Sequence, residues 1–291
     1  MLNRAMPSDT DAKPDKERRL VEWLAEQGSI AIGYSGGVDS AYVAAVAVQS
    51  LGADRVVGII GRSASYPDSQ WQNARTVAAQ IGLPVVEIDT DELNDPRYAA
   101  NPTNRCYFCK TELWSRLVPV ARERGIETVV DGTNADDVHD YRPGAQAARE
   151  HGVLSPLAMF ALTKADIRER SRARGLSTWR QPSSPCLSSR IPYGTPVTVV
   201  RLKRVERAEA ALRALGIEGD LRVRHFGELA RVELSKAELG SGRWSDPDGR
   251  ARLESAVIDA GGYTRVEIDQ RGFRSGALNE AIAQRAALSG D

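Results

Sequence analysis

The chain has 291 residues with 39 basic and 39 acidic side chains, so its zero net charge provides no overall field that would attract nucleic acid, and we expect no nucleic-acid partner. No apolar run reaches the length of a membrane span and no apolar signal core opens the chain, so we expect a cytoplasmic protein without a membrane partner. Three cysteines, an odd number, argue against a disulfide framework and for thiol or metal chemistry.

The first predicted strand leads into a short glycine-containing loop. Residues 1–15 are polar and aperiodic and are expected to form a flexible tail, while residues 16–27 have helical spacing. Residues 29–33 alternate small and β-branched types, as a buried strand does, and the apolar run 41–51 predicts a helix. The sequence SGGVDS between them therefore lies in a strand, loop and helix arrangement.

The residues of this loop are suited to binding phosphate. Gly36 and Gly37 allow positive φ and close backbone approach, so successive N–H groups can point at one anion at the start of a helix. Ser35 and Ser40 supply hydroxyl donors, and Asp39 would lie close to a Mg²⁺ ion carried by the phosphate. Since no Lys follows the glycines, the loop differs from GxxxxGK[ST] and resembles the pyrophosphate loop of the ATP pyrophosphatases. The alternative is an ordinary turn.

Strands and helices alternate through the first half of the chain. This order predicts parallel strands joined by right-handed crossovers, that is, an α/β fold with a doubly wound parallel sheet. Ligands of such sheets bind beyond the carboxyl ends of the strands, where the Ser35 loop would emerge. The further elements predicted in this half are strands at 55–61, 84–88 and 128–131 and helices at 68–81 and 111–124.

A second candidate segment follows the strand predicted at 128–131. It reads DGTNADD, beginning with Asp131 and Gly132, and is rich in amide and carboxylate groups that can hold a nucleotide or a divalent ion. The alternative is an Asn/Asp-rich turn with a helix cap. The parallel-sheet prediction places this segment at the same edge as the Ser35 loop, which favours a joint site.

The rest of the chain predicts a smaller α/β domain. A polar connection at 177–184 follows a helix at 163–174, and we divide the chain there into a PP-loop domain at 16–185 and a substrate-binding or oligomerisation domain at 186–291. The elements predicted after the connection are helices at 198–215, 250–260 and 278–288 and strands at 221–226, 229–234 and 264–268.

The three cysteines fall in two places. Cys106 and Cys109 form a CxxC at the mouth of a predicted helix, where Arg105 and Lys110 would lower the pKa values of both thiols. Such a pair can bind a metal or one edge of a cluster. Cys186 has polar, turn-rich flanks and should be accessible, the alternative being a buried structural thiol. Surface or hydrogen-bonding roles are expected for the histidines, His139, His151 and His225.

Eight short motifs occur in an order that resembles one known family, the LarE-type sulfur-insertion enzymes of lactate racemase maturation. They extend from about Glu22 to Glu280 and read SGGVDS, NRCYFCK, DGTNADD, DYRPG, CLSSRIPYGT, RVRHF, ARVEL and GFRSGALNE. The resemblance implies an enzyme that activates a carboxylate of pyridinium-3,5-dicarboxylate mononucleotide as an acyl-adenylate and converts it to a thiocarboxylate. It also implies a homohexamer and an external sulfide donor.

The resemblance implies two possible sulfur sources. In one kind of member a single cysteine, matching Cys186, gives up its own sulfur and becomes dehydroalanine. In the other kind three cysteines hold a 4Fe-4S cluster whose remaining iron can bind a sulfide for delivery. Because Cys106 and Cys109 accompany Cys186 in this chain, we favour the cluster.

The family's site residues carry over by motif. The nucleotide site would comprise Ser35, Gly36, Gly37, Asp39, Ser40, Asp131 and Gly132. The substrate-binding and charged active-site groups would be Arg190, Glu209, Arg222, Glu233 and Arg274. Arginines suit the phosphate and second carboxylate of such a substrate. The alternatives are a solvated helix position for Glu209 and a cross-strand ion pair between Arg222 and Glu233.

Three other functions share parts of this pattern. A tRNA thiolase uses the same loop, but the neutral net charge and the absence of paired zinc-ribbon cysteines count against it. An ammonia-using NAD synthetase would leave the cysteines unexplained, and an iron-sulfur carrier would not need the loop. The basic runs at 168–174 and 201–207 are interpreted as solvated helix faces, the alternative being a nucleic-acid patch.

Overall fold

The computed structural model describes residues 12–139, 143–182 and 185–274. The chain forms two compact units, each made of separate stretches. The first contains the residues up to Ser63, Asp68–Glu92 and Asn104–Gln181. The second contains Ala64–Pro67, Leu93–Thr103 and the residues from Pro182 onward. The second unit therefore draws two short segments from the first half of the chain, and the predicted boundary at 185 remains a prediction.

A four-stranded parallel sheet forms the centre of the first unit. The central strand β1 (Ile30–Gly33) pairs with β2 (Val56–Arg62) and β4 (Thr128–Val130), and β3 (Val85–Asp89) lies beside β2, which gives the order β3-β2-β1-β4. Ile30 is in register with both Val56 and Thr128. The predicted α/β fold with a parallel sheet is confirmed. The helices of this unit are α1 (Ala12–Glu26), α2 (Val38–Leu51), α3 (Asp68–Ile81), α5 (Arg105–Arg122), α6 (Pro143–Glu150), α7 (Pro156–Met159) and α8 (Lys164–Ala173).

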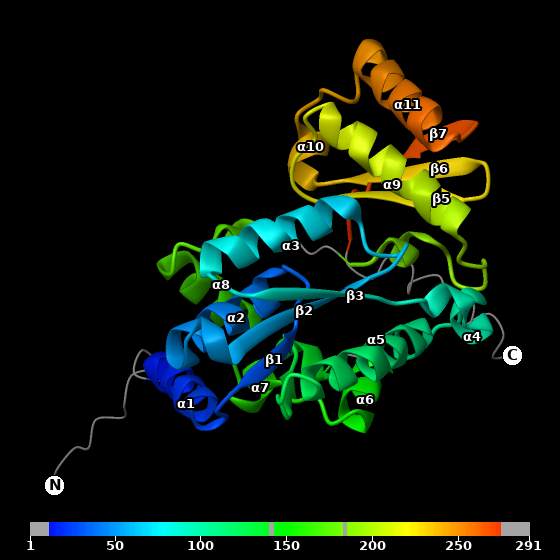
Figure 1. Ribbon diagram of the computed structural model, residues 1–291. Coiled ribbons are helices and arrows are strands. Elements are labelled where there is room, and N and C mark those ends of the chain that lie inside the picture. Colours follow the sequence, from blue (N-terminus) through cyan, green and yellow to red (C-terminus); the bar gives the residue numbers. More distant parts are fainter. Residues whose placement is uncertain (1–11, 140–142, 183–184, 275–291) are drawn as a thin grey trace, which may run out of the picture. The chain divides into compact units, whose positions relative to one another are not determined.

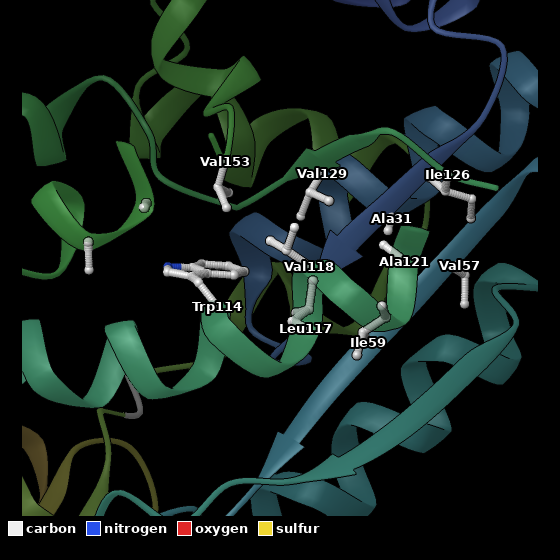
Figure 2. Close-up of a cluster of buried hydrophobic side chains, with 12 residues drawn as sticks. Ala31, Val57, Ile59, Trp114, Leu117, Val118, Ala121, Ile126, Val129 and Val153 are labelled. Atoms are coloured by element: carbon white, nitrogen blue, oxygen red, sulfur yellow. The ribbon is translucent and has the colours of Figure 1, made fainter. Parts of the chain in front are cut away.

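Helices cover both faces of the sheet, with α2 and α3 on one face and α5 on the other (Figure 1). Alternate strand residues point to opposite faces, so Ala31, Ile59 and Val129 meet Leu117 and other side chains of α5 in one buried cluster (Figure 2). A Val, Leu or Ile side chain buried there stabilises the fold by about 1.5–3 kcal/mol. This packing fixes the strand ends from which the candidate site emerges.

Helix α5 begins six residues before the predicted start at Thr111. No Gly or Pro occurs between Asn104, which is its N-cap, and Thr111, so nothing prevents the helix from extending back through the CxxC. The CxxC therefore belongs to the helix itself. Helix α6 was not predicted, and Pro143 occupies its first position, where a proline fits best.

The second unit has a three-stranded mixed sheet. Strand β5 (Leu221–Phe226) is antiparallel to β6 (Leu229–Leu234), and β7 (Arg265–Ile268) is parallel to β6. The bounds of β5 and β6 are those predicted. Side chains of α9 (Val199–Ala214) and α11 (Pro247–Gly261) share one core with this sheet. The short helices are α4 (Pro96–Ala99) and α10 (Lys236–Gly240), and the helix predicted at 278–288 lies outside the described residues.

None of the helices within the described ranges is both long enough and apolar enough to cross a bilayer.

Candidate functional site

The predicted phosphate loop follows β1 directly and enters α2. Gly36 has φ +67°, and a Cβ atom there would lie 2.5 Å from the Cβ of Ala74 in α3. Glycine is therefore required both for the left-handed conformation and for the close approach of α3. Gly37 has φ −76° and is the N-cap of α2, so its backbone conformation does not require a glycine. The first amides of α2 open onto this loop without partners inside the helix.

Two hydroxyls hold the loop closed. The Ser35 and Ser40 oxygens are 3.2 Å apart, and the hydroxyl of buried Ser40 donates to the carbonyl of Gly37 at 3.2 Å. The amide of Ser35 donates to the same hydroxyl oxygen at 3.3 Å, and the amide of Gly37 donates to the Ser35 hydroxyl at 3.4 Å. The chain's own hydrogen bonds thus hold the shape of the loop, and a loop held in this way has a lower ordering cost of binding.

The segment after β4 lies against the start of α2, as the parallel-sheet prediction required. A Cβ atom on Gly132 would lie 2.8 Å from the backbone nitrogen of Ser40. The Asp131 carboxylate accepts hydrogen bonds from the Thr133 amide at 3.0 Å and from the Thr133 and Ser155 hydroxyls, each at 2.8 Å. Asp131 therefore shapes the turn that brings Gly132 to the loop.

Asp39 faces two side chains that sequence reasoning missed. Its Oδ2 forms an ion pair with Lys164 at the start of α8, and its Oδ1 accepts from the Asn134 side-chain amide at 3.4 Å. Asn134 is buried, and its Oδ1 accepts from the Asp136 amide at 3.0 Å. The Thr163-x-x-Asp166 capping box marked the start of α8 in the sequence, but nothing local indicated that Lys164 reaches Asp39.

The CxxC lies in the first two turns of α5. Residues three apart on a helix share a face, so Cys106, which is exposed, and Cys109, which is partly exposed, lie side by side. The start of α6 packs here, because a Cβ atom on Gly144 would lie 2.9 Å from Lys110 Cγ and 3.5 Å from the Cys106 carbonyl. The Tyr107 hydroxyl donates to Glu150 at 2.7 Å. Gly144, the last residue of the DYRPG motif, thus lies against the NRCYFCK motif.

In the second unit, the chain around Cys186 is pinned by segment 93–103. Cys186 is partly exposed and precedes the 3-10 helix η5 (Leu187–Arg190). The side-chain amide of fully buried Asn101 donates to the carbonyls of Pro192 and Thr195, each at 2.8 Å. The Tyr98 and Ser188 hydroxyls are 2.6 Å apart. This clamp fixes the backbone on the C-terminal side of Cys186.

Arg190 fixes the same backbone from within. Its side chain is 2% exposed, and Nε and Nη2 donate to Glu209 at 2.9 and 3.0 Å. Nη1 lies 2.6 Å from the Pro185 carbonyl and 3.1 Å from the Cys186 carbonyl. All three guanidinium nitrogens thus serve protein acceptors, so the geometry makes Arg190 a positioning residue for Cys186. Glu209 is tied down as well, since it also accepts from the Val223 amide at 2.9 Å.

Strands β5 and β6 bring further charged residues together. Arg222 and Glu233 are register partners, but Glu233 forms its buried ion pair at 2.8 Å with Arg224, which the sequence analysis did not select. Arg224 also donates to the Ser189 carbonyl at 2.8 Å, and its buried Nε has no hydrogen-bond partner. Burial and the nearby charge of Arg190 lower the pKa of Arg222 to about 10, so its guanidinium remains charged at neutral pH.

Arg274, the last described residue, lies 3.9 Å from Asp269, which places it beside the same sheet. Phe273 is the residue before Arg274 in the chain. The Arg222 guanidinium stacks on the Phe273 ring, 4.8 Å from its centroid. Guanidinium groups therefore gather from β5 and from the chain after β7, and the donor set suits phosphate and carboxylate groups.

Comparison with known proteins shows which families this chain resembles. The NAD synthase family matches residues 18–116, the part that contains the loop. An uncharacterized protein of Synechocystis, slr1717, is 41% identical over 92% of this chain and 98% of its own length. The pyridinium-3,5-bisthiocarboxylic acid mononucleotide synthase of Lactiplantibacillus plantarum is 33% identical over 92% of this chain and 95% of its own length.

The chain belongs to the LarE family. An NH(3)-dependent NAD(+) synthetase of Pyrococcus furiosus is 40% identical over 67 residues, 22% of this chain and 25% of that enzyme. The similarity to this NAD synthetase is thus confined to a short part of the chain, whereas the LarE-type similarity extends over 92% of it. This LarE family member is an ATP-using enzyme of the PP-loop ATP pyrophosphatase type.

The cysteines of this LarE family member are divided between the two units, Cys106 and Cys109 in the first and Cys186 in the second. Within residues 12–139, 143–182 and 185–274, no three His, Cys, Asp or Glu side chains gather to hold a metal ion. The cluster therefore remains a prediction.

The basic runs of the LarE family member are largely engaged by its own chain. Arg168 donates to the Trp179 carbonyl at 2.6 Å, and Arg170 and Arg174 pair with Glu17. Arg204 donates to the Gly261 carbonyl at 3.0 Å. These contacts favour structural roles for the runs over a nucleic-acid patch.

His225 of the LarE family member is buried in β5, and its Nδ1 lies 3.2 Å from the Tyr263 hydroxyl. Burial and the charges of Arg204 and Arg201 lower its pKa from 6.5 to about 4. Below pH 6.5, His225 therefore binds a proton in the unfolded chain but stays neutral in the folded chain until the pH approaches 4. The contribution of neutral His225 to the free energy of unfolding is present in full above pH 6.5 and is lost as the pH falls toward 4.

We expect this histidine to lower the free energy of unfolding by about 2 kcal/mol between pH 7 and pH 5. Urea unfolding at both pH values checks this in the wild type and in His225→Gln, which has no proton to gain. The same pH dependence in both proteins would contradict the prediction, whatever the absolute stability of the variant.

Proposed function

We propose that this protein uses ATP to activate a carboxylate of pyridinium-3,5-dicarboxylate mononucleotide and converts that carboxylate to a thiocarboxylate. The observation that carries the proposal is the similarity to a pyridinium-3,5-bisthiocarboxylic acid mononucleotide synthase over 92% of the chain. The preformed loop at Gly36 and the guanidinium groups around Arg222 support it, because they suit a triphosphate and an anionic nucleotide respectively.

In the first step a substrate carboxylate oxygen attacks the α-phosphorus of ATP. The bond from that phosphorus to the bridging oxygen breaks, and pyrophosphate leaves with the electron pair. The loop between Ser35 and Ser40 and the first amides of α2 would stabilise the departing charge, and Asp39, in the first turn of α2, would bind Mg²⁺. This step requires positioning and charge neutralisation but no side-chain nucleophile.

In the second step a sulfide sulfur attacks the acyl carbon, and AMP leaves with the electrons of the C–O bond. Cys106, Cys109 and Cys186 are all at least partly exposed, so their thiols are accessible to iron, and thiolates are the usual ligands of iron-sulfur clusters. A 4Fe-4S cluster held by three thiolates has one iron without a protein ligand, which can carry an additional sulfide. Arg190 and Asn101 hold the backbone around Cys186 in place for this role.

The guanidinium groups of Arg222 and Arg274 are proposed to bind the phosphate and the second carboxylate of the substrate. Glu209 and Glu233 act through the arginines that they hold, Arg190 and Arg224. An external sulfide donor and assembly as a homohexamer, which the family resemblance implies, complete the proposal.

The test combines metal analysis with turnover. Protein purified without oxygen should contain iron and acid-labile sulfide, and Cys106→Ala should lose both. Wild-type protein given ATP, sulfide and the pyridinium dicarboxylate nucleotide should form AMP and the thiocarboxylate over many turnovers. Cys186 should keep its mass throughout.

Two results would contradict parts of the proposal. Iron-free protein in which turnover converts Cys186 to dehydroalanine would replace the cluster by sacrificial donation from that residue. ATP cleavage that the pyridinium nucleotide does not stimulate, while a tRNA does, would overturn the substrate assignment.

A further inference from the structure

The chain after β7 makes a tight turn that carries the first residues of the GFRSGALNE motif. Asp269, directly after β7, organises this turn. Its amide donates to the Val232 carbonyl at 2.9 Å, and its carbonyl accepts from the Gly272 amide at 3.0 Å. Its carboxylate, 8% exposed, accepts from the Arg271 amide at 2.9 Å and from Arg271 Nε at 3.2 Å. Hydrogen bonds of the chain itself therefore hold the turn in shape.

Gly272 brings this turn back against the sheet. It has φ +71°, and a Cβ atom there would lie 3.0 Å from the Leu234 carbonyl oxygen. A side chain at this position would therefore be strained and crowded. The Phe273 amide donates to the same Leu234 carbonyl at 2.7 Å. Because Leu234 is the register partner of Leu221, the backbone of Phe273 is fixed next to the strand position that precedes Arg222.

The Phe273 ring covers one face of the Arg222 guanidinium. Arg222 is 4% exposed, and its guanidinium carbon lies 4.8 Å from the ring centroid, which is within the range of a cation–π interaction. Its Nη1 donates to the Leu221 carbonyl at 2.6 Å. Stacking involves the face of the guanidinium, so the N–H groups in its plane stay directed at oxygen acceptors.

The ring also favours the charge of Arg222. Burial and the charge of Arg190 lower the pKa of Arg222 to about 10, so both disfavour a guanidinium cation at this position. The face of an aromatic ring carries partial negative charge and attracts a cation. Phe273 therefore offsets part of the cost of keeping a buried cation beside a like charge.

We infer that Phe273 is a positioning residue, whose ring holds the Arg222 guanidinium in the orientation that binds the anionic nucleotide substrate. The turn at Asp269 and Gly272 determines where the ring lies. The ring acts through Arg222 and takes no part in the chemistry. This inference rests on the proposed function, from which it takes the substrate. A contact that binds substrate and transition state equally lowers KM without changing kcat, so the expected effect is on affinity.

The test removes and then restores the ring. Phe273→Leu keeps an apolar side chain without an aromatic face, so KM for the pyridinium dicarboxylate nucleotide should rise roughly fivefold to tenfold, while kcat stays within about twofold. Titration calorimetry without ATP should show a matching loss of affinity for the nucleotide. Phe273→Tyr retains the ring and should bind the nucleotide as the wild type does. A wild-type KM in Phe273→Leu would overturn the inference.

A double-mutant cycle tests whether the ring acts through Arg222. In an Arg222→Gln background, Phe273→Leu should cause no further loss of nucleotide affinity, because the guanidinium that the ring positions is absent. Losses that add in the double variant would show that Phe273 acts in another way and would overturn the inference.

The matched control is Phe226→Leu. The Phe226 ring centroid lies 4.8 Å from the Arg231 guanidinium, the same distance and on the same pair of strands, but Arg231 pairs with exposed Glu267. This variant should leave KM for the nucleotide unchanged. An equal rise of KM in Phe226→Leu and Phe273→Leu would indicate a general disturbance of the sheet and would overturn the inference.

Failure of the proposed function would give a different result. If the wild-type protein does not bind the pyridinium nucleotide, the substrate assignment fails, and urea unfolding decides whether Phe273 holds Arg222. Phe273→Leu should then destabilise the wild type more than the Arg222→Gln variant, because only the wild type has a guanidinium to lose contact with the ring. Equal destabilisation in both backgrounds would overturn the inference.

Discussion

Gly36→Ala is expected to abolish ATP-dependent AMP formation and to destabilise the first unit. The added Cβ would lie 2.5 Å from the Ala74 Cβ and 3.0 Å from the Ala74 backbone nitrogen. Helix backbone cannot move aside as a flexible side chain can, so the loop or α3 must shift. A left-handed alanine costs about 1–2 kcal/mol and the clash about 1–3 kcal/mol more. The shifted amides would no longer converge on the phosphates.

Two controls separate the causes of this effect. Gly28→Ala also places alanine at positive φ, +72°, but meets no atom within 4 Å, so it should show the left-handed cost alone and keep full activity. Gly37→Ala has ordinary φ and its Cβ would lie 3.4 Å from Ser35 Oγ, so it should fold normally. Urea unfolding measures the stability of each variant, and chromatographic assays of AMP measure its activity. Wild-type activity in Gly36→Ala would show that the loop amides do not act on ATP.

Glu233→Leu should have the largest effect on stability, lowering the free energy of unfolding of the second unit by about 3–5 kcal/mol. Glu233 and Arg224 have side chains that are 5% and 7% exposed, and removing the carboxylate leaves a buried guanidinium charge without its counter-ion. The double variant Arg224→Met/Glu233→Leu removes both charges and should recover most of that loss, because a buried ion pair contributes little beyond an apolar pair of similar size.

The double variant also isolates a functional role. Arg224 donates to the Ser189 carbonyl, three residues after Cys186, so its loss should change the alkylation rate of Cys186 in a stably folded protein. Glu267→Leu is the matched surface control, since the Arg231–Glu267 pair is 36% and 56% exposed and its loss should cost less than about 1 kcal/mol. Equal costs for Glu233→Leu and Glu267→Leu in urea unfolding would contradict the argument.

Local sequence pattern was sufficient for many of the regular elements, although not for helix α6. The bounds of α3 and of strands β5 and β6 were predicted, because helical and strand patterns can be recognised within each segment. The start of α5 was placed too late, because the CxxC was placed at the mouth of the helix and not within it, although no residue there breaks a helix. The contact between Gly132 and Ser40 followed from the parallel-sheet prediction.

Long-range partners could not be predicted in this way. Lys164 meets Asp39 across 125 positions of sequence, and no local pattern connects them. Arg190 was predicted to bind substrate, whereas its nitrogens reach Glu209 on α9 and nearby carbonyls, acceptors that become adjacent only after folding. Arg224 was overlooked because Arg222 matched the same motif, and because the ion pair of Arg224 with Glu233 joins residues that are not register partners.

The clamp around Asn101 limits how this enzyme can be dissected or recombined. A fragment starting at 186 would lack Leu93–Thr103, and the carbonyls of Pro192 and Thr195 would lose the amide that satisfies them. The C-terminal region is therefore not a portable module that evolution or an engineer can graft onto another ATP-binding half. The stretch carrying the clamp and the stretch carrying Cys186 must be inherited as a pair.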